Sequence, residues 1–105
     1  MVKVYKGAEI KLSVSIDPID GNTMDDYNFE IELYVSGGNI VKKTKDKCIR
    51  VDTNNYIVTL DTNALNRVGK LILKTTAYIP DGDFDDNTRT EVSCVDTGVI
   101  ILKEL

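Results

Sequence analysis

The feature that most constrains the fold is a regular alternation of apolar and polar residues along residues 27–36. Tyr27, Phe29, Ile31, Leu33 and Val35 form the apolar set, and the residues between them are mostly charged or polar. A period of two residues places the apolar set on one face of a β-strand, whereas an amphipathic helix repeats every 3.6 residues. We therefore expect a chain built from strands that each bury one face.

The same pattern continues along most of the chain. Val, Ile and Thr supply 32 of the 105 residues and Ala only three, and β-branched side chains fit a pleated sheet better than a helix. Gly37-Gly38 and Pro80-Asp81-Gly82 are typical of turns. One helical turn, capped by Thr62, is expected to end before Gly69. The expected strands are residues 9–16, 27–36, 39–44, 48–51, 56–61, 70–79, 89–95 and 99–102, the last two separated by a turn at residues 96–98.

Short strands separated by turn signals, without a helix long enough for a βαβ crossover, define the expected fold class. The chain is predicted to be all-β, an antiparallel two-sheet immunoglobulin-like β-sandwich of about seven to eight strands. A small barrel is the alternative. The length of 105 residues suits a single domain over residues 1–105.

Charge and composition exclude several classes of function. The net charge is −4, so neither nucleic acid nor an anionic membrane is an expected partner. Histidine is absent, which removes the commonest general base, and we expect no enzymatic activity and no cofactor. No apolar run approaches the ~20 residues that span a bilayer. The first seven residues do not resemble a signal peptide, so general secretion is not expected.

Two acidic segments, residues 17–26 and 81–87, hold eight of the twelve aspartates. Clustered carboxylates suit Ca²⁺, but they are also common in turns. An EF-hand is rejected because its sixth position would be Asp86 instead of glycine and its twelfth would be Val92. A calcium site of another kind stays open. Up-and-down counting of the strands puts the two segments at opposite ends of the sandwich.

The two cysteines, Cys48 and Cys94, do not establish a disulfide. A domain of this size that relied on disulfides would usually carry more cysteines. We expect two reduced and mostly buried thiols, because free cysteine packs like a small apolar residue. Pairing between the two stays open.

A family resemblance follows from the order of several short segments. These are Lys6-Gly7 before an alternating strand, residues 27–33, residues 56–61, Ala64-Leu65 leading to Gly69-Lys70-Leu71, and a long strand that ends at Ile79-Pro80-Asp81. In this order they resemble the immunoglobulin-like domains of bacteriophage virions, particularly the N-terminal domain of phage baseplate upper proteins. Such domains usually continue into a fibre-like region, so an end at Leu105 favours a stand-alone accessory subunit.

The resemblance implies a non-enzymatic structural protein of the virion, assembled in the cytoplasm of the bacterial host. Its partners would be other virion structural proteins of the capsid or of the tail and baseplate. Head or tail location, copy number and oligomeric state stay open. The alternative is a bacterial cell-surface carbohydrate-binding or adhesion module, with or without calcium. The residues expected to bind a partner lie in the N-terminal segment, on outward strand faces and in a loop: Val2, Val4, Tyr5, Tyr34, Tyr78 and Phe84.

Overall fold

The computed structural model describes residues 1–105 and is all-β, with two single turns of 3-10 helix. None of its helical segments is long and apolar enough to cross a membrane. The strands are β1 (Val2–Tyr5), β2 (Glu9–Ser15), β3 (Asn28–Val35), β4 (Val41–Thr44), β5 (Ile49–Asp52), β6 (Asn55–Asp61), β7 (Gly69–Pro80) and β8 (Thr88–Leu102). The 3-10 turns are η1 (Lys45–Lys47) and η2 (Thr62–Ala64).

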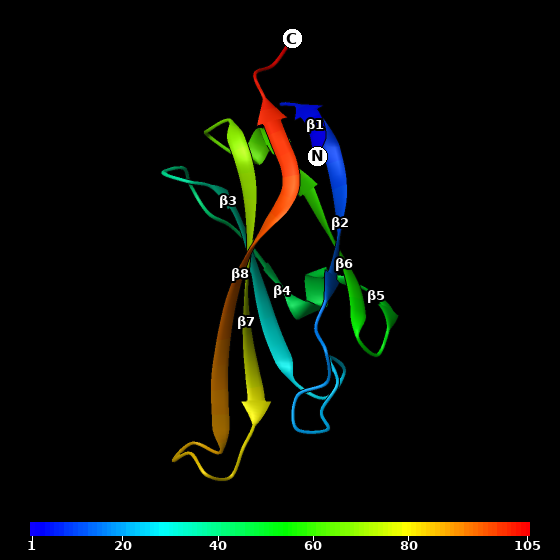
Figure 1. The fold of residues 1–105 in the computed structure, drawn as a ribbon, viewed down its shortest axis with the longest axis vertical. Coiled ribbons are helices and arrows are strands. Elements are labelled where there is room, and N and C mark those ends of the chain that lie inside the picture. Colours follow the sequence, from blue (N-terminus) through cyan, green and yellow to red (C-terminus); the bar gives the residue numbers. More distant parts are fainter.

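The strands form two sheets, as expected for a sandwich (Figure 1). One sheet has the order β1-β8-β7-β3-β4 and the other the order β2-β6-β5. All neighbours are antiparallel except β1 and β8, which are parallel, with Val2 opposite Val99 and Tyr5 opposite Leu102. The prediction of an antiparallel sandwich is wrong for this pair, because the N-terminal segment lies alongside the last strand and runs in the same direction.

The core lies between the sheets and is built by the alternation described above. On β3, Phe29, Ile31 and Leu33 are fully buried, and Val35 is nearly so. The ring of Phe29 stands edge-on to Tyr56, with the ring centroids 5.1 Å apart. Inward residues of β2, β6, β7 and β8, with three residues of the connections, complete one cluster of 17 buried side chains. The predicted buried face of residues 27–35 is therefore confirmed.

The end of the chain differs from the prediction of two strands. β8 runs without interruption from Thr88 to Leu102, and the residues expected to form a turn make a bulge opposite β7. Gly98 has a φ of +78°. Thr97 Oγ1 donates to the carbonyl of Leu71 (2.9 Å), and Asp96 Oδ1 accepts from the backbone N–H of Gly98 (2.9 Å). These side-chain bonds satisfy the bulge locally, so the strand continues instead of reversing.

The short helical turn near residue 62 is present, but Thr62 is not its cap. Asp61 occupies the cap position and accepts from the backbone N–H of Asn63. Thr62 is fully buried. Its hydroxyl accepts from the N–H of Gly7 (2.8 Å) and donates to the carbonyl of Ala8 (2.7 Å). Thr62 therefore fastens the β1–β2 connection to the three-stranded sheet.

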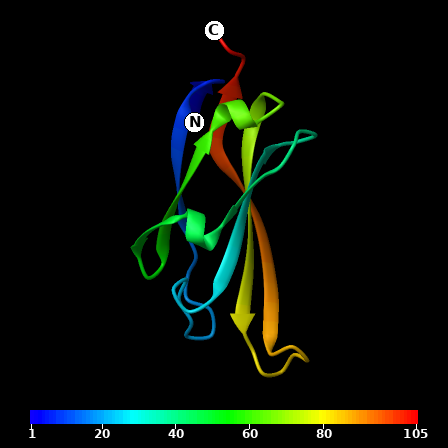
Figure 2. The ribbon, with the colours of Figure 1, turned by 180° about the vertical axis from the view of Figure 1, so that it is seen from behind.

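The molecule is elongated, with principal extents of 51 × 27 × 22 Å. The hairpin of β7 and β8 accounts for much of this length and reaches beyond the shorter strands at one end (Figures 1 and 2). The β2–β3 connection lies at the same end, while the C-terminus lies at the other (Figure 1). The hairpin arm therefore presents a long edge beside the three-stranded sheet.

Candidate functional site

The N-terminal residues expected to bind a partner lie on β1, at the edge of the five-stranded sheet. Val2 and Tyr5 are exposed, whereas Val4 is half-buried against the core. The backbone of all three is engaged with β8 in the parallel pair. The edge on the β8 side of this segment is therefore already used within the domain.

The three other predicted residues lie on the outer sheet face and at the hairpin tip. Tyr34 and Tyr78 are half-buried; the hydroxyl of Tyr34 is 3.4 Å from Cys94 Sγ, and that of Tyr78 donates to Glu30 Oε2 (3.3 Å). They stand opposite Ile72 and Asn28, which separates them by about 20 Å along the strands. Phe84 is exposed between β7 and β8. The six predicted residues do not form one patch, and their role in binding stays a prediction.

The two acidic segments lie at the same end of the molecule, so the prediction of opposite ends is wrong. Arg89 joins them: its Nη2 is 2.6 Å from Asp20 Oδ2 and its Nη1 is 2.6 Å from Asp81 Oδ2. Nearby carboxylates raise the pKa of Arg89, first through the hydrogen bond with Asp20. The Arg89 guanidinium thus lies between the two loops, where it pairs with a carboxylate of each. No cluster of three or more His, Cys, Asp or Glu side chains is arranged to hold a metal ion.

Neither cysteine forms a disulfide in the structure. Cys48 is half-buried, and burial raises the pKa of its thiol. Cys94 is exposed on β8, so the expectation of mostly buried thiols is wrong for this residue. It is exposed because no second layer covers the outer face of this part of β8.

The open side of the sandwich is the site that sequence reasoning missed. β2 pairs with β6 along one edge, and its other edge has no partner. β8 pairs with β7 from Thr88 to Asp96, while β1 covers its second edge only from Val99 to Leu102. Two unpaired strand edges, one from each sheet, therefore flank the same side of the molecule.

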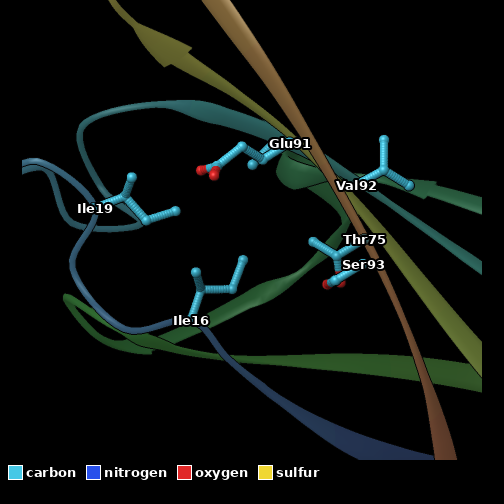
Figure 3. A pocket seen from close by; sticks show the side chains of 7 residues that line it. Ile16, Ile19, Thr75, Glu91, Val92 and Ser93 are labelled. Carbon is cyan, nitrogen blue, oxygen red and sulfur yellow. The ribbon is translucent and has the colours of Figure 1, made fainter.

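A groove runs between these two edges. It consists of two adjoining cavities of about 200 and 410 Å³ that share Ile16, Thr75 and Ser93. Ile16 and Ile19 face Thr75, Glu91 and Ser93 across the smaller cavity, and Val92 points away from it (Figure 3). The larger cavity is lined by Leu12, Ser13, Val14, Ser15, Ile16, Leu73, Thr75, Ser93, Val95, Asp96 and Thr97.

The exposure of β8 agrees with this open side. All six residues from Glu91 to Asp96 are exposed, including Val92 (58%) and Val95 (53%). The sequence carried a signal for this exposure: along residues 88–96, neither the even-numbered nor the odd-numbered positions are all apolar. A strand without one fully apolar face is not buried on either side.

A second polar cluster lies beside the core, apart from the groove. Asp25 accepts a bidentate pair of hydrogen bonds from Arg50, at 2.8–3.0 Å, and a third from the hydroxyl of Tyr56 at 2.5 Å. These bonds, first from Arg50 and then from Tyr56, lower the pKa of Asp25 to about 2. Burial, with the bond to Asp25, raises the pKa of Tyr56 to about 12. The cluster links the β2–β3 connection to β5 and β6.

The Asp25 cluster predicts a pH dependence of stability. Because the pKa of Asp25 is 3.8 ordinarily and about 2 in the folded chain, its stabilising contribution is complete above about pH 5 and is lost as the pH falls towards 2. In Asp25→Asn, the unfolding free energy should depend less steeply on pH between 2 and 5. Urea denaturation across this range measures the slope. Asp85→Asn is the control, since Asp85 makes no side-chain hydrogen bond or ion pair, and an equal flattening there would contradict the assignment.

These features describe a molecule whose distinctive surface is an open groove between two strand edges. No reacting side chains converge on it; its polar lining consists of hydroxyl and carboxylate groups. Comparison with protein families, with curated proteins and with solved structures finds no match for this chain.

Proposed function

We propose that this protein is a non-enzymatic immunoglobulin-like module that docks onto other proteins of a bacteriophage particle as an accessory subunit. The observation that carries the proposal is the unpaired edge of β8 along the projecting hairpin arm. An exposed strand edge presents unpaired backbone donors and acceptors, and monomeric proteins usually cover or protect such edges. An edge that is left open beside a groove is suited to binding another chain.

The order of the strands supports the immunoglobulin-like assignment. Taken in chain order as strands A, B, C, C′, D, E, F and G, the five-stranded sheet contains G-F-C-C′ and the three-stranded sheet B-E-D. This is the arrangement of an immunoglobulin sandwich extended by a C′ strand. The first strand departs from the common arrangement because it lies beside G instead of B. Tryptophan and the inter-sheet disulfide of antibody domains are both lacking.

The surface of the arm supports docking over catalysis. Val92 and Val95 on β8 and Phe84 at the tip are exposed apolar side chains on one projecting element. Of these, Val95 lines the groove, and exposed apolar residues beside a groove are typical of contact surfaces between proteins. The lack of histidine also argues against acid–base catalysis.

The assignment to a phage particle rests on the segment order that resembles immunoglobulin-like virion domains. The calcium-dependent surface module is less well supported, because Arg89 already neutralises Asp20 and Asp81 between the two acidic loops. A carboxylate whose charge is already balanced by a guanidinium at 2.6 Å attracts a cation less strongly. We therefore retain the virion subunit as the function.

The experiment that tests this function is a search for the protein in purified particles. Particles are induced from the bacterial strain that carries the gene and are purified on a density gradient. Mass spectrometry should find the chain at a fixed ratio to the major capsid or tail protein, and electron microscopy of the same particles should locate it. If the chain sediments apart from intact particles, or is recovered only in trace amounts, the proposal is overturned.

A further inference from the structure

We propose that the groove between β2 and β8 receives an extended, positively charged segment of another particle protein, which adds a strand to the free edge of β8. The proposal deepens the docking function and rests on it. It assigns the groove, instead of the six aromatic and aliphatic residues predicted from the sequence, as the principal contact.

The first step is the backbone. The free edge of β8 comprises the nine residues from Thr88 to Asp96, which pair only with β7. At about 3.3 Å per residue, this edge is about 30 Å long. An added strand of about eight residues would satisfy the unpaired donors and acceptors along most of it. β1 already occupies the same edge farther along, from Val99 to Leu102, so the added strand would continue an existing ladder.

The second step is the lining, which favours small apolar side chains at alternate positions of the added strand. Ile16, Ile19 and Ala77 line the smaller cavity, and Leu12, Val14 and Leu73 line the larger one. Successive side chains of a strand point to opposite faces. Every second residue of the added strand would therefore cover this apolar lining, while the others would face solvent on the outer side of the sheet.

The third step is charge. Glu91 and Asp96 are the charged residues that line the two cavities, and neither cavity is lined by a lysine or arginine. Arg89 lies nearby on the same strand; its guanidinium is paired with Asp20 and Asp81 at 2.6 Å and lies farther, 3.8 Å, from Glu91, so it neutralises Glu91 only in part, while Asp96 makes no ion pair. Lysine or arginine in the incoming segment would complement Glu91 and Asp96. If two copies docked groove to groove, Glu91 and Asp96 of one copy would face the same acids of the other. We therefore assign the site to a different protein.

The test begins with purified protein and two synthetic peptides of about eight residues, the length that spans about 26 Å as a strand. One capped peptide alternates valine with lysine and the other alternates valine with glutamate. In NMR titrations at low ionic strength, the lysine peptide should shift and protect the amides of residues 88–96. The glutamate peptide should bind about tenfold more weakly or worse, a difference of about 1.4 kcal/mol.

β4 supplies an internal control for indiscriminate edge pairing. It is the opposite edge strand of the same sheet and carries Lys42 and Lys43. If the lysine peptide shifts β4 as strongly as β8, or if the two peptides bind the β8 edge equally well, the charge-selective groove is overturned. Neither peptide binding at β8 would overturn it as well.

A pair of substitutions tests the groove in the intact protein. Ser93→Trp places a large ring in the part of the groove that both cavities share. Thr59→Trp is the matched control, because Thr59 is also exposed on a strand, β6, but lies outside the β8 edge and lines neither cavity. Both variants should unfold near the wild-type temperature. Ser93→Trp should lose peptide binding, and Thr59→Trp should keep it.

The same variants distinguish the groove from the function on which it rests. If the wild type and Thr59→Trp enter particles while Ser93→Trp does not, the groove is supported. If all three enter particles equally, the groove is overturned and the function stands. If the wild type does not enter particles, the proposed function is overturned, and the peptide titration alone tests whether the groove binds a basic strand. A dimer in sedimentation analysis that Ser93→Trp abolishes would assign the groove to a second copy and overturn a foreign partner.

Discussion

Replacing Phe29 by alanine is expected to lower the free energy of unfolding by about 3–5 kcal/mol, the usual cost of emptying a buried aromatic site. The side chain of Phe29 is fully buried at the centre of the core. Its ring is edge-on to both Tyr56 and Tyr27, with centroid distances of 5.1 and 6.4 Å. Alanine would remove both aromatic contacts and leave a cavity that the paired strands around it cannot collapse to fill.

Urea denaturation followed by circular dichroism measures this loss as a lower transition midpoint with an unchanged slope. The chain offers a matched control in its second phenylalanine. Phe84 is 48% exposed at the hairpin tip, so Phe84→Ala should change the unfolding free energy by no more than about 0.5 kcal/mol. Comparable losses in the two variants would contradict the assignment of the core between the sheets.

Replacing Lys45 by methionine is expected to cost about 2–4 kcal/mol of unfolding free energy, although lysine is ordinarily a surface residue. The Lys45 ammonium donates to the backbone carbonyls of Met24 and Tyr27, each at 2.8 Å. It also lies over the rings of Phe29 and Tyr56, at 5.6 and 5.9 Å from their centroids. Methionine keeps an unbranched apolar stem but cannot donate, and each carbonyl left without a partner costs about 1–3 kcal/mol.

The control for Lys45 is its neighbour on the same 3-10 turn. Lys47 is exposed and makes no side-chain hydrogen bond or ion pair, so Lys47→Met removes the same charge without breaking a contact. Its unfolding midpoint in urea should stay close to that of the wild type. Lys45→Arg keeps the donors and should recover part of the stability. If the two methionine variants lose equal stability, the hydrogen bonds and ring contacts of the Lys45 ammonium contribute nothing to the free energy of unfolding.

The sequence predicted the parts of the fold that depend on local periodicity. The alternation along residues 27–36 identified the buried face of β3, and the same period identified β2 and β7. These predictions held because a one-residue slip would turn every apolar side chain to solvent. The signal at Asp96-Thr97-Gly98 was misread, because the side chains that favour a turn can equally satisfy a bulge inside a long strand.

The placement of the loops could not be predicted by counting reversals of the chain. The connection through η1 takes the chain from the end of one sheet to the edge of the other, and β4 and β5 run in the same direction. β2 and β7 end on the same side of the molecule, where Arg89 joins the loops that follow them. β4 runs in the direction of β7, because both are antiparallel to β3, and β5 runs in the direction of β2, because both are antiparallel to β6. This one crossing without reversal brings the acidic loops together.

The groove was invisible to sequence reasoning for a related reason. Its walls come from β2 and β8, which are separated by most of the chain, and its existence depends on which strand edges are left without partners. Side-chain patterns determine which face of a strand is buried, but they do not determine which strand lies next to it. Only the lack of a continuous apolar face along residues 88–96 hinted at this site.

The meeting of both acidic loops at one end gives the molecule an electric polarity along its 51 Å axis. The two loops at that end hold eight aspartates, three of them paired with Arg50 or Arg89, while Lys6, Arg67 and Lys103 line one pocket with Glu104 near the C-terminal end. Such a charge separation gives the protein a dipole moment, which orients the protein as it approaches a charged partner. An approaching negatively charged surface would meet the C-terminal end first, and this preference would fade as salt shortens the range of the field to about 10 Å at 0.1 M.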